Sequence, residues 1–343
     1  MVANLTRWFA RHARDLPWRR TRDPYAIWVS EIMLQQTQVK TVLPYWERWM
    51  AALPNVQALA RAGQGTVLKL WEGLGYYTRA RNMQRAAKII VADHQGRFPE
   101  RFEDVLALPG IGRYTAGAIC SIAFGEPKPI LDGNVIRVLT RVFGIAGDPK
   151  AREVNERLWA LAGELVTRAR ENPGTLNQAL MELGAIVCTA KNPQCELCPI
   201  ASHCLAFKTN RIDKFPQIPK RAPATARTFH AFIINERGRF FVRQRPAGVV
   251  NAHLWEFPNQ EIKTFVRNGN GTQEPFLTIK HSITRYRITL KAFKLTNRAK
   301  RYEKEGRWLP LTKLHNLPFT SAHKQILQKL SAPRRKVARR VAD

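Results

Sequence analysis

The feature that most constrains the fold of this chain is a group of four cysteines within 17 residues: Cys188, Cys195, Cys198 and Cys204. Disulfides would need a secreted context that nothing in the sequence supports, so thiols this close together predict a metal-centred loop. Zinc sites made of four cysteines are common. A single Cys-x2-Cys flanked by lone cysteines, with a proline after it, is more typical of iron–sulfur loops. The spacing favours a [4Fe–4S] cluster but leaves zinc open.

The length and charge of the chain limit the number of domains and the kind of partner that it can have. The 343 residues are too many for one average core and fit about two domains. A formal net charge of +30 indicates a polyanionic partner, nucleic acid first and an anionic membrane second. No apolar run approaches the roughly 20 residues of a membrane-spanning helix, and Met1 to Arg20 contain no signal-peptide core. We therefore expect a protein that is neither secreted nor membrane-bound. If bacterial, it is expected to be cytoplasmic and associated with the nucleoid, and we expect it to be a monomer.

Charge and residue pattern both divide the chain in two. From Arg211 onward there are 29 basic and 8 acidic residues, against 27 and 18 in residues 1–210. Up to residue 187 the apolar spacing predicts helices joined by Gly/Pro turns, with the fold starting near Asp15. The expected helical segments are Pro24–Trp49, Leu68–Val91 around the turn Gly73–Gly75, Glu100–Leu106, Tyr114–Phe124, Val135–Phe143, Arg152–Arg168 and Leu176–Val187.

The pattern changes after the cysteines. Three prolines among basic residues predict an interdomain linker. Phe232–Asn235 and Arg239–Gln244 predict a hairpin, Ile279–Leu295 further strands, and Ser321–Leu330 a helix. The basic stretch Arg334–Arg340 is expected to be disordered. We therefore expect a helical domain at 1–208, a linker at 209–227, a second domain at 228–331 and a basic tail at 332–343.

The sharpest local motif is a turn with two glycines inside Leu108–Ala116. One helix is expected to end at Leu108 and another to begin near Arg113. Gly110 and Gly112 lack side chains, so their backbone N–H groups can approach an anion at the positive end of the second helix. The alternative is an ordinary helix–helix turn with a glycine cap. In a chain of charge +30, the motif predicts a helix-hairpin-helix that grips DNA phosphates without reading sequence.

Two carboxylates stand among apolar residues. Asp132 precedes a predicted helix, and an Asp in this position is usually an N-cap. The apolar residues before it indicate, however, that this carboxylate lies at a buried helix N-terminus. Glu31 lies inside an apolar helix, although a solvated face is the usual place for a helical Glu. Its neighbours predict at least partial burial, which raises the pKa and keeps the group protonated for use as a general acid. Cys120, alone in an apolar stretch, is predicted to be a small core residue.

Together these motifs resemble the helix-hairpin-helix DNA glycosylases, and the chain is identified as a member of the MutY family of adenine DNA glycosylases. The resemblance is specific from about Arg14 to Cys204 and continues more loosely to about Leu330; its main segments are Trp28–Val39, Gly73–Asn82, Leu108–Ala118, Leu131–Arg137 and the cysteine loop. It implies a multi-domain α plus α+β fold: an all-helical helix-hairpin-helix glycosylase domain with an iron–sulfur loop, followed by a Nudix-like α+β domain. It also implies that the four cysteines hold a [4Fe–4S] cluster.

The resemblance implies a role for each matching residue. Glu31 would be the catalytic acid and Asp132 the carboxylate that stabilises the cationic sugar, while Tyr114 and Asn134 would position the lesion nucleotide and these carboxylates. The other positions are expected to contact DNA or the base: Gln36 and Tyr76 as the wedge that fills the gap in the duplex, Gly110, Gly112 and Arg81 on the DNA, and Trp18, Arg19 and Gln178 in the adenine pocket.

The residue types suit that chemistry. A base inside a duplex must be flipped out before an enzyme can reach it. Protonation by Glu31 would make adenine a better leaving group, and a fixed carboxylate at Asp132 would stabilise the positive charge that develops on the sugar. Similar endonucleases carry Lys where Tyr114 stands, and that lysine attacks the sugar as a Schiff-base nucleophile. The resemblance therefore implies hydrolysis without a main strand-cleaving activity, on adenine mispaired with 8-oxoguanine or guanine in double-stranded DNA.

Three rival classes stay open. A thymine glycosylase acting on G·T mismatches can also carry Tyr at position 114; the others are a non-catalytic iron–sulfur DNA-binding protein and a DNA-binding module with a zinc site. The second domain has no acidic Nudix box after Leu254–Pro258, so nucleotide hydrolysis is not expected there. Many family members carry Phe-Ser-His where this chain has Ile283-Thr284-Arg285, and Thr284, which keeps the hydroxyl, is the expected DNA contact.

Overall fold

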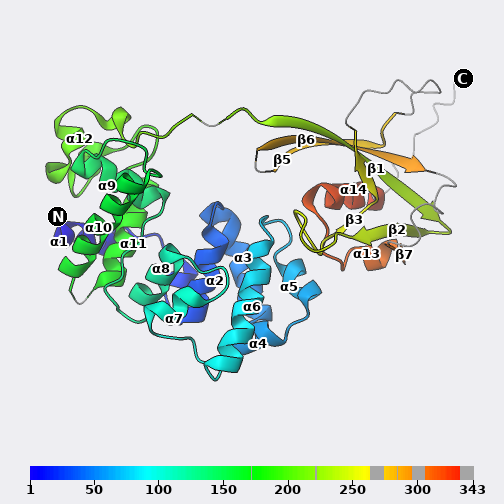
Figure 1. Ribbon diagram of the computed structural model, residues 1–343, viewed down its shortest axis with the longest axis horizontal. Coiled ribbons are helices and arrows are strands. Elements are labelled where there is room, and N and C mark those ends of the chain that lie inside the picture. Colours follow the sequence, from blue (N-terminus) through cyan, green and yellow to red (C-terminus); the bar gives the residue numbers. More distant parts are fainter. Residues whose placement is uncertain (171, 221, 263–273, 284, 296–305, 333–343) are drawn as a thin grey trace, which may run out of the picture. The chain divides into compact units, whose positions relative to one another are not determined.

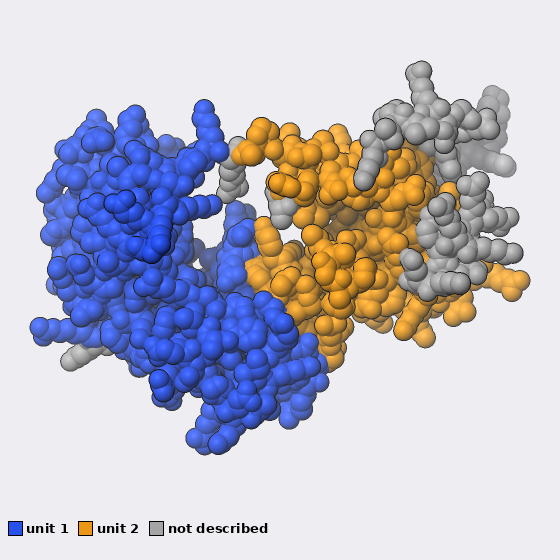
Figure 2. Space-filling model, in the orientation of Figure 1, with its two compact units in different colours: residues 1–62, 82–220 blue, residues 63–81, 221–343 orange. Residues whose placement is uncertain are grey.

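The computed structural model describes residues 1–170, 172–220, 222–262, 274–283, 285–295 and 306–332. The chain forms two compact units (Figure 2): unit 1 comprises Met1–Ala62 with Asn82–Lys220, and unit 2 comprises Gly63–Arg81 with Arg221–Asp343. Unit 2 therefore includes a segment from the helical half of the sequence. The predicted domain boundary at residue 208 assigned that segment to the first domain. No helix in these described ranges is long and apolar enough to cross a bilayer.

Unit 1 is helical (Figure 1). Its helices are α1 (Val2–His12), α2 (Pro24–Leu34), α3 (Val39–Ala52), α4 (Val56–Arg61), α6 (Thr78–Asp93, entering from Asn82), α7 (Phe102–Ala107), α8 (Arg113–Ala123), α9 (Gly133–Phe143), α10 (Arg152–Arg168), α11 (Pro173–Ile186) and α12 (Leu205–Lys208). Short 3-10 turns cover Pro17–Arg19, Cys195–Leu197, Ala201–His203 and Ile212–Lys214. The predicted segment Pro24–Trp49 is broken into α2 and α3, because Gln36 takes a φ of 57°, which ends a right-handed helix.

The fold begins earlier than the expected start near Asp15. In α1, Leu5, Trp8 and Phe9 are buried, and the helix packs against α11. Their spacing of three and four residues places all three on one face of the helix. The opening segment is therefore a structural helix of unit 1.

Two helices cross closely in the core of unit 1. A Cβ added to Gly184 of α11 would lie 2.6 Å from the Cβ of Asn134, near the start of α9. Only glycine allows the two backbones to approach this closely. The crossing fixes the first turn of α9, with Asp132 as its cap, against α11. Cys120 is completely buried in α8, so its predicted place in the core is confirmed.

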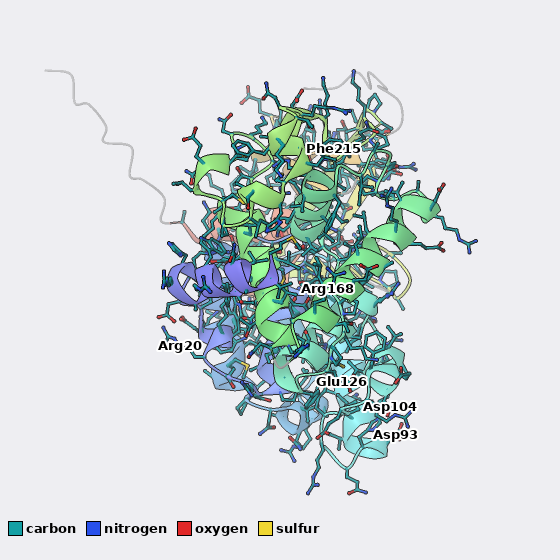
Figure 3. All side chains as sticks on the ribbon, turned by 90° about the vertical axis from the view of Figure 1, so that its left-hand side faces the viewer. Arg20, Asp93, Asp104, Glu126, Arg168 and Phe215 are labelled. Carbon is teal, nitrogen blue, oxygen red and sulfur yellow. The ribbon has the colours of Figure 1, made fainter. Side chains whose placement is uncertain are left out.

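The connection between the units is shorter than residues 209–227. Arg141 donates a hydrogen bond from Nε to the carbonyl oxygen of Phe215 at 3.1 Å, and Phe215, labelled in Figure 3, is buried. The side chain of Gln217 accepts a hydrogen bond from the backbone N–H of Gly147 at 2.7 Å. Strand β1 already begins at Thr225. Both ends of the predicted linker therefore belong to folded structure.

Unit 2 has a mixed sheet in which the strand order is β3-β2-β1-β6-β5, with β4 paired to β1 and β7 to β2. The strands are β1 (Thr225–Glu236), β2 (Arg239–Gln244), β3 (Trp255–Glu256), β4 (Asn259–Glu261), β5 (Leu277–Ile283), β6 (Tyr286–Leu295) and β7 (Gly306–Pro310), and the helices are α5 (Gln64–Leu70), α13 (Leu311–Leu314) and α14 (Ser321–Ser331). The predicted β1–β2 hairpin is confirmed, with Glu236 opposite Arg239. The later strands and the late helix are confirmed as well, whereas Arg334–Arg340 lies outside the described residues.

Apolar residues of α14 close the core of unit 2. Ala322, Ile326 and Leu327 pack with sheet residues such as Ile233 and Val242. Strand β1 runs parallel to β6, and β5 and β6 are antiparallel. The chain thus combines an all-helical unit with an α+β unit, as the sequence predicted.

Candidate active site

A pocket of about 570 Å³ opens in unit 1 where α2, α8, α9 and α11 meet. Apart from the cysteines, it gathers most of the predicted site residues: Trp18, Arg19, Glu31, Gln36, Tyr114, Asp132, Asn134 and Gln178 all line it. A volume of this size is typical of a small-ligand site. Residues separated by more than 100 positions in the sequence therefore face one space.

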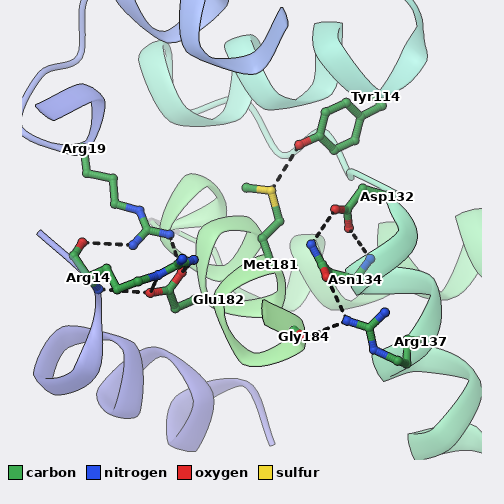
Figure 4. Close-up of polar contacts among 9 residues, drawn as sticks. All are labelled: Arg14, Arg19, Tyr114, Asp132, Asn134, Arg137, Met181, Glu182 and Gly184. Atoms are coloured by element: carbon green, nitrogen blue, oxygen red, sulfur yellow. Dashed lines mark hydrogen bonds and ion pairs between the residues drawn. The ribbon is translucent and has the colours of Figure 1, made fainter. Parts of the chain in front are cut away.

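Glu31 is the buried acid of this pocket. It lies in α2 and is 6% exposed, so the burial predicted from its apolar neighbours is confirmed. Its Oε2 accepts a hydrogen bond from the Tyr114 hydroxyl at 2.7 Å, and that hydroxyl lies 3.1 Å from the sulfur of Met181 (Figure 4). Burial raises the pKa of Glu31 to about 7, although the Tyr114 hydroxyl lowers it in part. Glu31 can therefore hold a proton near neutral pH.

Asp132 combines the two roles that its sequence position suggested. As the cap of α9, its Oδ1 accepts hydrogen bonds from the backbone N–H groups of Asn134 at 3.0 Å and Val135 at 2.7 Å. Its Oδ2 accepts a third from the side-chain amide of Asn134 at 2.9 Å. Burial raises the pKa of Asp132, and these donors offset part of that rise. The helix terminus thus favours a carboxylate anion at the pocket.

Asn134 is oriented by an arginine one turn further along α9. The Asn134 side-chain oxygen accepts a hydrogen bond from Nη2 of Arg137 at 2.8 Å, and the same nitrogen donates to the carbonyl oxygen of Gly184 at 2.6 Å (Figure 4). Nε of Arg137 donates to the carbonyl oxygen of Cys188 at 2.6 Å. The amide that contacts Asp132 is therefore held from its far side by α11 and the cysteine loop.

The opposite wall of the pocket contains an ion-paired carboxylate that the sequence reasoning missed. The side chain of Glu182 in α11 is completely buried. It accepts hydrogen bonds from Nε and Nη2 of Arg14, at 2.8 and 2.6 Å, and from Nη2 of Arg19 at 2.8 Å. Burial alone would raise the pKa of Glu182, but the two arginines lower it to about 2. An acidic residue inside the apolar run Leu180–Leu183 is the same signal that pointed to Glu31, and it could have found this site.

The glycine hairpin is built as its sequence suggests. Helix α7 ends at Ala107 and α8 begins at Arg113, with Gly112 as its cap. Gly110 has a φ of 82°, and a Cβ there would lie 2.6 Å from the Cβ of Asn82. A Cβ on Gly112 would meet no heavy atom within 4 Å. The N-terminus of α8 is therefore open to an anion.

The other predicted DNA contacts are distributed elsewhere. Gln36 is exposed beside the pocket. Tyr76 belongs to unit 2, where it is 48% exposed with a φ of 47°. The guanidinium of Arg81 donates hydrogen bonds to Ala252 O and Thr78 Oγ1 at 3.0 and 2.8 Å, so it already has partners within unit 2. Thr284 lies outside the described residues.

The cysteine loop brings four thiols to one cavity. Its four thiols are free of disulfides and line one cavity with apolar side chains such as Val138 and Leu183. Four cysteine thiolates are the usual ligands of a [4Fe–4S] cluster, and here all four border the same cavity. Nη1 of Arg141 lies 3.3 Å from the sulfur of Cys188, and such hydrogen bonds stabilise anionic cluster sulfurs. The residues present fit an iron–sulfur cluster.

Protein-family models agree with this arrangement. Residues 29–164 match the HhH-GPD superfamily of base excision DNA repair proteins, residues 188–204 match the iron–sulfur binding domain of endonuclease III, and residues 230–329 match the NUDIX domain. The second match covers the cysteine loop from its first to its last cysteine. The fold and these matches define a DNA glycosylase of base excision repair that carries a [4Fe–4S] cluster and a Nudix-like domain.

Comparison with known proteins narrows the class. The chain is 40% identical over 257 residues to the adenine DNA glycosylase of Buchnera aphidicola subsp. Schizaphis graminum, covering 75% of this chain and 74% of the relative. It is 47% identical over 228 residues to the mouse (Mus musculus) adenine DNA glycosylase, covering 64% of this chain and 44% of that protein. A solved thermostable thymine-DNA glycosylase matches at 30% identity with a TM-score of 0.54, over 61% of this chain and 95% of that one. The chain belongs to the adenine DNA glycosylase family.

Proposed function

We propose that this chain hydrolyses the N-glycosidic bond of adenine mispaired with 8-oxoguanine or guanine in duplex DNA. The observation that carries the proposal is the contact between Tyr114 and Glu31, where a buried acid with a pKa of about 7 lines the same pocket as Asp132. A carboxyl with a raised pKa that donates a proton, together with a second carboxylate fixed at a helix N-terminus, is the pair that glycosidic cleavage needs.

Catalysis begins once the adenine nucleotide has left the base stack and entered the pocket. Glu31, whose pKa of about 7 leaves a large fraction protonated near neutral pH, donates its proton to a ring nitrogen of adenine, which makes the base a neutral leaving group. As the bond breaks, positive charge develops on the sugar, and Asp132 stabilises it electrostatically. Asn134 holds Oδ2 of Asp132 in place through the amide contact of 2.9 Å. Water then completes the hydrolysis.

Tyr114 favours hydrolysis over strand cleavage. A lysine at this position could attack the sugar carbon and form a Schiff base, but a phenol held 2.7 Å from Glu31 cannot. The Tyr114 hydroxyl instead orients the acid toward the base. We therefore infer a monofunctional glycosylase that leaves an intact strand with an abasic site.

The base pocket is formed by Trp18, Arg19 and Gln178. Trp18 is buried and provides an apolar wall for the purine. Arg19 is held by Glu182 at 2.8 Å, so its guanidinium has a fixed direction, which an exposed arginine lacks. Gln178 offers both a donor and an acceptor from α11.

DNA contacts come from both units. The amides of Gly110 and Gly112 bind a phosphate at the positive end of α8, and Gln36 and Tyr76 each fill space that the flipped nucleotide leaves. Arg81 and Thr284 contribute from unit 2. The part of the chain from Arg211 onward carries a net charge of +21, and this charge binds the opposite strand.

The four cysteines are the ligands of the cluster, which supplies a rigid, redox-capable centre for the loop when bound. The protein is proposed to act as a monomer. If the source is bacterial, the protein acts in the nucleoid, where its DNA substrate lies.

The proposal is tested with the full-length, cluster-loaded protein on four duplexes of one sequence that contain A·8-oxoG, A·G, A·T or G·T. Adenine release under single-turnover conditions is expected from the first two and not from A·T. Alkali-labile abasic sites should appear without strand breaks before alkali is added. Thymine release from G·T in preference to adenine would instead assign the activity of the thymine-DNA glycosylase that shares this fold. Release of no base from any duplex would leave a DNA-binding protein without glycosylase activity.

A further inference from the structure

Unit 2 contains a buried carboxylate that the proposed chemistry does not use. Glu72 follows α5 and is 5% exposed. Its Oε1 accepts a hydrogen bond from the backbone N–H of Phe319 at 2.8 Å, and its Oε2 accepts bonds from Nζ of Lys324 at 2.7 Å and Nζ of Lys69 at 2.9 Å. Phe319 and Lys324 are 247 and 252 residues further along the chain. Glu72 thus joins the segment Gly63–Arg81 to the C-terminal part of unit 2.

A second set of bonds anchors the same segment. Nζ of Lys69 also donates to the carbonyl oxygen of Leu317 at 3.1 Å. On the far side of the loop, Nη1 of Arg81 donates to the carbonyl oxygen of Ala252 at 3.0 Å. The residues between Glu72 and Arg81 are therefore held from both ends by the Nudix-like domain.

The loop between these anchors has a defined internal structure. Trp71 is completely buried and its Nε1 donates to the carbonyl oxygen of Gly75 at 3.0 Å, while the hydroxyl of Tyr77 accepts a bond from the N–H of Gly73 at 3.1 Å. The guanidinium of Arg79 lies 5.5 Å from the ring centre of Tyr76. Tyr76 projects from this frame, 48% exposed.

The backbone of Tyr76 carries strain. Its φ of 47° is in the left-handed region, which costs a tyrosine on the order of 1 kcal/mol or more. Such a conformation persists only where the surrounding structure fixes it. The contacts from the C-terminal part of unit 2 anchor the chain on both sides of Tyr76, at Glu72 and at Arg81.

We propose that Glu72 and Lys324 are positioning residues through which the C-terminal part of unit 2 sets how the Tyr76 ring is presented to DNA. This inference rests on the proposed function, because it takes Tyr76 as a residue that enters the duplex. The Nudix-like domain then does more than read the opposite strand, since it also holds the loop that fills the gap left by the flipped nucleotide. A buried carboxylate bonded to a backbone N–H and to two ammonium groups favours one arrangement, because any other leaves a buried charge with fewer partners.

Lys324→Met in the full-length, cluster-loaded protein is the primary test. It removes the ammonium from the partly exposed end of the pair, where the lysine side chain is 39% exposed and the Glu72 side chain 3%. We expect single-turnover release of adenine from an A·8-oxoG duplex to slow on the order of tenfold. Lys329→Met, which changes an exposed lysine of the same helix, is the matched control and should leave the rate unchanged. Equal rates for Lys324→Met and the control would overturn the proposal.

A double-variant cycle separates positioning from general destabilisation. If Lys324 acts through Tyr76, then Tyr76→Ala together with Lys324→Met should be no slower than Tyr76→Ala alone. Effects that multiply would show that Lys324 acts elsewhere and would contradict the assignment.

Amide hydrogen exchange gives a readout that does not depend on glycosylase activity. In Lys324→Met and in Glu72→Gln, the amides of residues 74–77 should exchange at least several-fold faster, while those of α8 in unit 1 keep their protection. Unchanged protection of the loop would refute the anchor whichever base is released. Faster exchange in a protein that releases no base from any duplex would refute the proposed function and keep the anchor.

Discussion

The two units bury carboxylates in opposite electrostatic settings. In unit 1, Glu31 accepts a hydrogen bond from the neutral hydroxyl of Tyr114 and has no ion-pair partner within the described part of the chain. In unit 2, Glu72 bonds two lysines and Glu256 bonds Arg243 and Arg245. All three glutamates are at most 6% exposed. The same side chain at the same depth thus has a neutral hydrogen-bond donor in one case and two cations in the others.

The pKa of each buried glutamate depends on whether its side chain is paired with a cation. Burial raises the pKa of Glu31 to about 7. Burial would raise the pKa of Glu256 too, but His323, Arg245 and Arg243 hold it below its ordinary value. Glu182 shows that the rule is local and not a property of a whole unit, since its arginines lower its pKa to about 2 inside the same pocket as Glu31. Among the glutamates Glu31, Glu72, Glu182 and Glu256, only Glu31 has no ion-pair partner among the described residues, and it is the one whose pKa is raised.

Replacing Glu31, the buried acid without an ion-pair partner in the described residues, is expected to have the largest effect on the rate of adenine release. Glu31→Gln keeps the volume and the acceptor for Tyr114 but cannot donate a carboxyl proton. We expect adenine release from A·8-oxoG to fall roughly a thousandfold or more, measured in single-turnover assays, while binding to the same duplex stays within a few-fold. The matched control is Glu164→Gln, whose side chain is 60% exposed in α10. A Glu31→Gln variant that turned over at the natural rate would remove the acid assignment.

Asp132→Asn is expected to have the next largest effect. Asparagine caps helices as well as aspartate does, so α9 keeps its first turn while the negative charge is lost. Adenine release should slow on the order of a hundredfold, with little change in the thermal midpoint. Asp132→Ala is the comparison variant, because it loses both charge and cap and should also unfold at a lower temperature. Equal rates for Asp132→Asn and the natural chain would show that no anion is needed at the sugar.

The features that sequence predicted are those encoded within one short segment. The glycine turn, the acid in an apolar helix and the cysteine loop are each readable from consecutive residues, because backbone freedom, burial and metal ligation leave local patterns. The pairing of Glu182 with Arg14 joins residues 168 positions apart, and that of Glu72 with Lys324 joins residues 252 apart. No periodicity encodes such partners, which tertiary packing alone brings together.

The assignment of Gly63–Arg81 to unit 2 was unpredictable for the same reason. Its residues have ordinary helical and turn patterns, and nothing local shows that Glu72 will meet Phe319. Helix α1 is different, because the spacing of Leu5, Trp8 and Phe9 was available in the sequence and would have predicted an amphipathic helix.

Tyr114→Phe tests the hydrogen bond that tunes Glu31. The Tyr114 hydroxyl lowers the pKa of Glu31, so its removal should raise that pKa further above 7. Because the protonated form is the active one, adenine release should decline at a higher pH in the variant than in the natural chain. Near neutral pH we expect a rate roughly fivefold lower, from the loss of one orienting hydrogen bond. Single-turnover rates between pH 5.5 and about 9 measure both; a decline at lower pH would contradict the contact's role.

The smallest expected effect is on stability, and its sign differs between the units. The folded-state pKa of Glu31 is raised to about 7, so the stability linked to its proton is present below the ordinary pKa near 4.3 and is lost as the pH rises through about 7. Glu31→Gln should therefore stabilise unit 1 at pH 8, by at most about 4 kcal/mol, and change little at pH 4. Glu256 has a lowered pKa, so its contribution is present at neutral pH and is lost on acidification.

Glu256→Gln should accordingly destabilise unit 2 at pH 8, by about 2 kcal/mol, because Arg243 and Arg245 lose their counter-charge. The loss should shrink toward pH 4. Denaturant-dependent amide exchange, followed separately in α8 and in β2, reports the two units in one sample. Glu164→Gln, on the exposed face of α10, corrects for the substitution itself. A shift of the same sign in both variants at pH 8 would mean that burial depth, and not the partner, sets the state of these carboxylates.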